Sequence, residues 1–225
     1  MSRATKLYST TVGKKIVMAL SGIVLAGFVV AHMAGNLHLF EGAAEINEYA
    51  AFLREVGSPL VPHGAALWAS RVILLLALGV HVVSWLSVAG KSRDARRTGY
   101  RSYERKVFSK TSLTMAWAGV FIFLFVIFHL LHLTTGDAHP DFVQGDVYHN
   151  LVVGLGGWPM AAVYLGAAAA VALHLYHGIW SATQTLGLDY PRLDRYRRPV
   201  SIGIAVIVGL GFAAVPLAIA TGVVS

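Results

Sequence analysis

Residues 16–37 read IVMALSGIVLAGFVVAHMAGNL, a continuous apolar run in which His32 is the only ionisable side chain. A helix rises about 1.5 Å per residue, so about 20 apolar residues cross the roughly 30 Å hydrocarbon layer of a bilayer. Four further stretches are long and apolar enough to do the same, at about 65–89, 112–134, 159–185 and 200–223. The sequence therefore predicts an all-α integral membrane protein with five transmembrane helices in a single domain, residues 1–225.

The composition agrees with a membrane protein and excludes several other classes. The chain is 56% hydrophobic and 13% charged, whereas soluble domains are roughly 45–50% apolar and about 25% charged. The net charge is +7, and the basic residues that give it lie between the apolar stretches, as is typical of membrane topology. We therefore expect no nucleic-acid partner. Cysteine is absent, which excludes disulfides, iron–sulfur clusters held by this chain and covalent haem attachment. We see no repeat and no soluble domain along the chain.

The basic residues predict how the chain crosses the membrane. They precede the first span and fill the second and fourth connections, with examples at Lys14 and Lys15, from Lys91 to Lys110, and from Arg192 to Arg198. The positive-inside rule then places the N-terminus in the cytoplasm and the C-terminus outside the cell membrane. Residues 43–56, between the first two spans, are expected to form a short amphipathic helix on the outer surface.

Each of the first four spans carries a histidine in its interior, whereas no span contains an Asp or a Glu. Counted from the cytoplasmic end of each helix, His32 lies at about 25 Å, His129 at about 28 Å, His81 at about 15 Å and His174 at about 16 Å. The four histidines thus form two level pairs, His32 with His129 and His81 with His174. Depth alone does not distinguish His174 from His177, which lies one turn away on the same face.

A level pair of imidazoles on two helices can bind both faces of one haem. The iron is then six-coordinate and has no position left for oxygen or substrate, so it carries electrons. The two levels differ by roughly 10 Å, which predicts one haem toward each side of the membrane. The simpler alternative is that the histidines are hydrogen-bonded packing residues in a transport or structural membrane protein.

Two short motifs point to a family. Residues 174–181 read HLYHGIWS, and residues 30–36 read VAHMAGN. Together with the span number and the long basic second connection, they resemble the cytochrome b subunits of succinate dehydrogenase and fumarate reductase, of the single-anchor, five-helix, two-haem kind. The resemblance implies that four helices form a haem-binding bundle with a fifth helix at its periphery. It also implies an outer haem held by His32 and His129 and an inner haem held by His81 and His174. The chain departs from the family pattern at His177.

The resemblance further implies the partners of the chain. These are a flavoprotein with covalent FAD, which carries the succinate/fumarate active site, and an iron–sulfur subunit. Both are expected to dock at the cytoplasmic connections, in a complex that can form a higher oligomer. The two haems b are non-covalent, and the electron acceptor or donor in the membrane is menaquinone or another quinone.

A quinone needs an apolar slot with a few polar groups and a proton path. The outer ends of the first and third spans supply such groups at Asn36, His38, Glu41 and His132. A rival inner position lies near Trp85, His177 and Trp180. A different di-haem anchor, of a formate dehydrogenase, hydrogenase or nitrate reductase, is the main alternative to the family as a whole.

Overall fold

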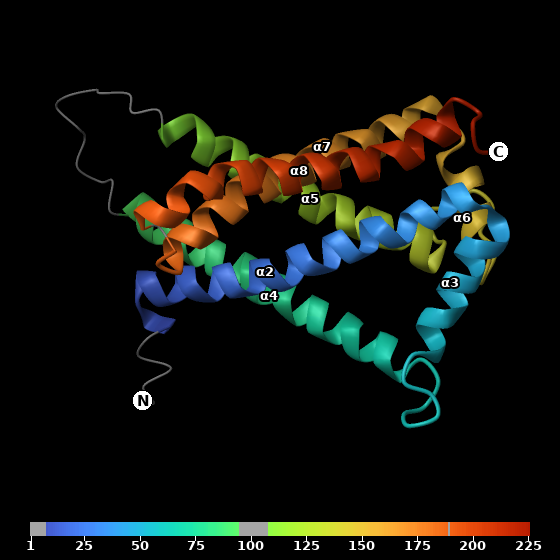
Figure 1. Ribbon diagram of the computed structural model, residues 1–225, viewed down its shortest axis with the longest axis horizontal. Helices are drawn as coiled ribbons and strands as arrows, with labels where there is room; N and C mark the ends of the chain where they lie inside the picture. The colour runs from blue at the N-terminus through green and yellow to red at the C-terminus, as the bar shows by residue number, and fades with distance from the viewer. Residues whose placement is uncertain (1–7, 95–107, 189) are drawn as a thin grey trace.

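The computed structural model describes residues 8–94, 108–188 and 190–225, which are helical without any strand (Figure 1). Five of the helices in this part of the chain are long and apolar enough to cross a membrane. They are α2 (Thr11–Asn36), α4 (Ala65–Asp94), α5 (Phe108–Leu130), α7 (Trp158–Thr185) and α8 (Pro191–Ala220). The prediction of an all-α protein with five membrane-spanning helices is confirmed.

The last helix begins earlier than expected, at Pro191 rather than near residue 200. Pro199 lies inside this helix, whereas Pro159 occupies the first turn of α7. Proline lacks the N–H that would bond the carbonyl four residues before it, yet a helix packed against neighbours tolerates this loss. Pro216 also lies within α8.

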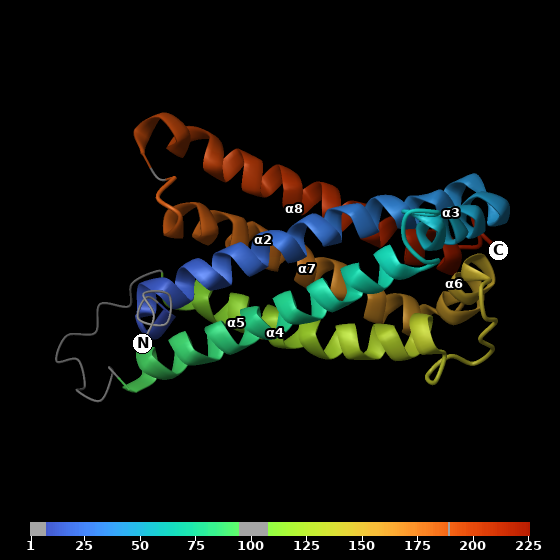
Figure 2. The same cartoon turned by 90° about the horizontal axis from the view of Figure 1, so that it is seen from below.

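The helices form a bundle of four with α8 against one side. α2 packs along α4 and α7, α5 packs along α7, and α8 packs along α7 and α2 (Figures 1 and 2). Large apolar side chains such as Leu75, Leu124 and Ile207 point outward and are exposed. Such exposure would be unfavourable in water but suits a surface that faces lipid.

Two short helices cover the end of the bundle where the C-terminus lies (Figure 1). They are α3 (Ala43–Glu55), which is the predicted surface helix, and α6 (Val147–Leu155); the 3₁₀ turn η1 (Leu37–Glu41) leads from α2 into α3. Their buried side chains form a core with the end of α8 that includes Leu39, Ile46, Leu151, Leu155 and Ile219. We call α3, α6 and η1 the outer cap.

Asn47 joins the two helices of the outer cap. Its side-chain oxygen accepts hydrogen bonds from the backbone nitrogens of Val147 at 2.8 Å and Tyr148 at 3.1 Å. Its side-chain nitrogen donates to Asp146 at 3.0 Å. The backbone N–H of His149, followed by the side chain of Asn47, holds the pKa of Asp146 below its ordinary value of 3.8. Asn47 and Asp146 therefore satisfy the free N–H groups at the start of α6.

Replacing Asn47 by alanine is expected to destabilise α6, because two backbone N–H groups lose their acceptor. The expected cost is about 1–3 kcal/mol, measured as faster hydrogen–deuterium exchange in residues 147–155. The neighbouring exposed Glu48→Ala is the matched control and should change exchange little. Because folding lowers the pKa of Asp146, its ionised side chain stabilises α6 above pH 3.8, and this stabilisation is lost as the pH falls below that value. Equal exchange in Asn47→Ala and the parent protein would contradict this account.

Candidate functional site

The four interior histidines meet in the two pairs that helix depth predicts. The rings of His32 on α2 and His129 on α5 have centroids 5.8 Å apart, with their planes at 81°. The rings of His81 on α4 and His174 on α7 have centroids 6.3 Å apart, with their planes at 63°. We call these the outer pair and the inner pair.

The two helices of each pair are not close neighbours in the bundle. Close packing joins α2 with α4, α5 with α7 and α2 with α7, and not α2 with α5 or α4 with α7. The paired rings therefore reach toward each other between helices whose backbones stand apart. This is the arrangement that a flat group held between two helices requires.

The ring separations can be compared with metal ligation. An imidazole nitrogen binds a metal at about 2.0–2.1 Å and the ring centre lies about 1.1 Å farther away, so two imidazoles on opposite sides of one ion have centroids roughly 6.3 Å apart. The inner pair has this separation and the outer pair is slightly closer. The ring planes are free to differ, because each ring can turn about its own metal–nitrogen bond.

The ring of His81, which extends from α4, contacts α2 through one of its nitrogens. Its Nδ1 lies 3.0 Å from the backbone carbonyl of Met18 and 3.3 Å from the hydroxyl of Ser21. A carbonyl can only accept, so Nδ1 carries the proton and Nε2 keeps its lone pair. Histidines that bind metals are oriented in this way by a hydrogen bond from the second nitrogen. The absence of a side chain at Gly22 lets the ring edge approach the α2 backbone: a Cβ there would lie 3.2 Å from the His81 ring.

The ring of His174 lies against α5, where a Cβ at Gly119 would lie 3.3 Å from it. The Nδ1 of His174 is buried without a hydrogen-bond partner among the described residues. Its Nε2, like that of His81, is the nitrogen left for another ligand.

The outer pair is supported by aromatic rings. Phe28 stacks on His32 at 5.3 Å and Phe125 stacks on His129 at 5.7 Å, in both cases from one turn earlier on the same helix. The Nδ1 of His129 is buried and finds no hydrogen-bond partner in the described part of the chain. A buried nitrogen of this kind costs free energy unless a further group satisfies it. The geometry of the two pairs fits two haems, each held by two imidazole ligands.

The residues expected at the quinone site fall into two groups. His38 and Glu41 form an exposed pair at 3.2 Å, with the ring of His38 stacked on Tyr49 at 4.6 Å. Asn36 makes no side-chain capping bond at the start of η1. His132 is instead fully buried, in a π-helical turn, Leu131–Thr135, that follows α5. The structure thus does not bring these four residues into one cluster.

His132 contacts Tyr164, which the sequence analysis missed, and His139. Its Nδ1 lies 2.8 Å from the hydroxyl of Tyr164, and its ring centre lies 5.1 Å from that of His139. Its Nε2 is buried without a partner among the described residues. Helix depth could have identified Tyr164. Measured from the cytoplasmic end of each helix, as for the histidine pairs, Tyr164 lies at about 31 Å and His132 at about 33 Å.

Trp180 and His177, which belong to the alternative inner position for the quinone, have other contacts. The guanidinium of Arg197 lies 4.5 Å from the ring centre of Trp180, and Arg197 also donates to Thr183 at 3.0 Å and to Asp194 at 2.8 Å. Arg197 is buried, so Trp180 helps to attach the start of α8 to the end of α7. His177 packs against Tyr176 with ring centres 4.8 Å apart and does not face His81.

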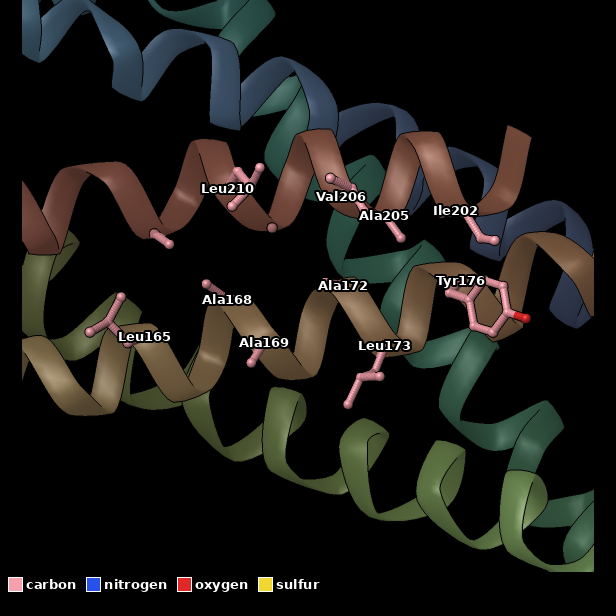
Figure 3. Close-up of a pocket in the computed structure, with 12 residues that line it drawn as sticks. Leu165, Ala168, Ala169, Ala172, Leu173, Tyr176, Ile202, Ala205, Val206 and Leu210 are labelled. Carbon is pink, nitrogen blue, oxygen red and sulfur yellow. The ribbon is translucent and has the colours of Figure 1, made fainter. Parts of the chain in front are cut away.

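An apolar groove lies between α7 and α8 (Figure 3). Small residues line it on both helices, including Ala168, Ala172, Ala205 and Gly209, and it contains no histidine. Residues 95–107, in the middle of the expected docking connection from Lys91 to Lys110, lie outside the described residues.

Fold and site together define a multi-pass, all-α membrane protein with two half-buried histidine pairs at different depths. Comparison with protein-family models, with characterised proteins and with solved structures gives no match to this chain.

Proposed function

We propose that the chain is the di-haem cytochrome b membrane-anchor subunit of a succinate dehydrogenase or fumarate reductase. In this role it passes electrons between an iron–sulfur subunit and a membrane quinone. The observation that carries the proposal is the two opposed histidine pairs, with ring centres 6.3 and 5.8 Å apart, in spans that contain no carboxylate. The motifs HLYHGIWS and VAHMAGN favour this family over other di-haem anchors.

Bound haem b supplies one-electron transfer. His81 and His174 would hold one haem, and His32 and His129 would hold the other. The distance between the two pairs can be measured along α2. The ring of His81 lies beside Met18 and Gly22. His32 is ten residues beyond Gly22 and therefore about 15 Å farther along the helix. This spacing is larger than the roughly 10 Å that depth alone suggests. A haem iron held by two imidazoles would have no position left for oxygen or substrate and would serve electron transfer alone.

The proposed orientation places the N-terminus in the cytoplasm and the C-terminus outside the cell membrane. The start of α2 and the C-terminus lie at opposite ends of the long axis (Figure 1), as five spans require. The inner pair is then the pair nearer the cytoplasm, where the iron–sulfur and FAD-bearing subunits would dock. The outer cap covers the other end, near the outer pair and His132.

Purification of the tagged chain from its own membranes tests the proposal. We expect two haems b per chain in a pyridine haemochrome assay, together with a co-purifying iron–sulfur subunit and a flavoprotein whose flavin remains bound after denaturation. Molybdenum or nickel in the complex would instead identify a formate dehydrogenase, nitrate reductase or hydrogenase anchor. Protein from haem-replete cells that contains no b-type haem would refute the proposal and favour a transport or structural role.

A further inference from the structure

The two helices that carry the outer pair share several residues at one fixed spacing, because His32 on α2 and His129 on α5 are 97 positions apart. Six identities recur at this spacing, and four of them are Met18 and Met115, Gly22 and Gly119, Phe28 and Phe125, and His32 and His129. α4 and α7 begin 93 positions apart, at Ala65 and Trp158, and His81 and His174 have the same spacing. The two helical hairpins, α2 with α4 and α5 with α7, therefore correspond at these positions, although the sequence has no overall repeat.

The two inner ligands lie against matching glycines. In the first hairpin the ring of His81 lies between the carbonyl of Met18, which is 3.0 Å from its Nδ1, and the bare backbone of Gly22. In the second hairpin the ring of His174 lies against the bare backbone of Gly119, and its Nδ1 has no hydrogen-bond partner among the described residues. We call these two arrangements the imidazole seats.

We propose that the two imidazole seats, built by the carbonyl of Met18 with Gly22 in one hairpin and by Gly119 in the other, position both inner ligands and tune the reduction potential of the inner haem. This inference rests on the proposed function. In the first seat the carbonyl facing Nδ1 of His81 keeps the proton on that nitrogen and leaves Nε2 for the iron. In the second seat the bare backbone of Gly119 receives the ring of His174.

The two seats differ at one pair of matching positions, residue 21 in the first seat and residue 118 in the second. Ser21 in the first seat lies 3.3 Å from Nδ1 of His81, and its hydroxyl hydrogen is directed to the carbonyl of Val17 at 2.8 Å. The oxygen of Ser21 is thus free to accept from His81. Ala118 occupies the matching position in the second seat, where Nδ1 of His174 is buried without a partner among the described residues. One seat therefore has an additional acceptor that the other lacks.

This difference predicts opposite effects of two small substitutions. A stronger acceptor at Nδ1 makes the imidazole a better electron donor, which stabilises oxidised iron and lowers its reduction potential. Ser21→Ala removes an acceptor and should raise the potential of the inner haem. Ala118→Ser adds a hydroxyl that can donate to its own helix and accept from His174, so it should lower that potential.

Redox titration of the purified complex, followed in the optical and EPR signals of each haem, measures both changes. We expect shifts of opposite sign in the inner haem and an unchanged outer haem. A purely structural role for Ser21 would not produce opposite shifts from these two variants. Unchanged inner potentials in both variants, with two haems still bound, would overturn the inference while leaving the proposed function intact.

The glycines give a second measurement. Gly22→Ala and Gly119→Ala bring a methyl group within 3.2 and 3.3 Å of the imidazoles, so the inner haem should show a shifted low-spin EPR signal or a reduced content. Gly27→Ala is the matched control on α2, because nothing lies within 4 Å of a Cβ at that position. The inference fails if the two seat variants keep the parent EPR signal, or if Gly27→Ala changes the inner signal as much as they do.

Discussion

Protein in which His81 or His174 is replaced by alanine is expected to contain one haem per chain instead of two. Each replacement removes one of the two imidazoles of the inner pair, whose ring centres lie 6.3 Å apart. His32→Ala and His129→Ala should remove the outer haem in the same way, because their rings form the other pair. Pyridine haemochrome content gives the number of haems, and redox titration shows which of the two remains.

His177→Ala is the matched control for His174→Ala, since the two histidines lie one turn apart on α7. The ring of His174 faces His81, whereas His177 packs against Tyr176. We therefore expect His177→Ala to keep both haems. Loss of the inner haem in His177→Ala but not in His174→Ala would move the ligand by one turn. Retention of both haems in His81→Ala would contradict the ligand assignment altogether.

The sequence was sufficient for the features that depend on distance along a helix. The number of spans follows from apolar length, and the pairing of the histidines follows from a constant rise per residue. Both remain valid however the helices pack. The start of α8 was missed because residues around Pro199 are polar enough to suggest a connection, although the helix continues there from Pro191.

The features that depend on which helix faces are in contact could not be derived in this way. The imidazole seats need the rotation of α4 against α2, which brings His81 to Met18 rather than to another turn. The division of the expected quinone residues has a similar cause. His38 leaves the bundle on the 3₁₀ turn η1, whereas the π-helical turn keeps His132 inside, and short changes of helix type of this kind have weak sequence signals.

Quinone reduction is expected to depend on His132 and Tyr164 at the outer end of the bundle. His132 is fully buried, its Nδ1 lies 2.8 Å from the hydroxyl of Tyr164, and its Nε2 has no partner among the described residues. Such a nitrogen can bond a quinone carbonyl, and Tyr164 and the adjacent His139 offer a route for protons toward the outer cap.

His132→Ala and Tyr164→Phe should therefore lower the quinone reductase activity of the complex about a hundredfold, with both haems retained. Tyr164→Phe is the sharper variant, because it removes only the hydroxyl and keeps the ring that packs on His129. His38→Ala and Glu41→Ala, in the exposed pair, should have smaller effects if that pair only exchanges protons with solvent. Trp180→Phe tests the rival inner position and keeps an aromatic ring beside Arg197. Full activity in His132→Ala and Tyr164→Phe, with activity lost in Trp180→Phe that still holds two haems, would place the quinone on the cytoplasmic side.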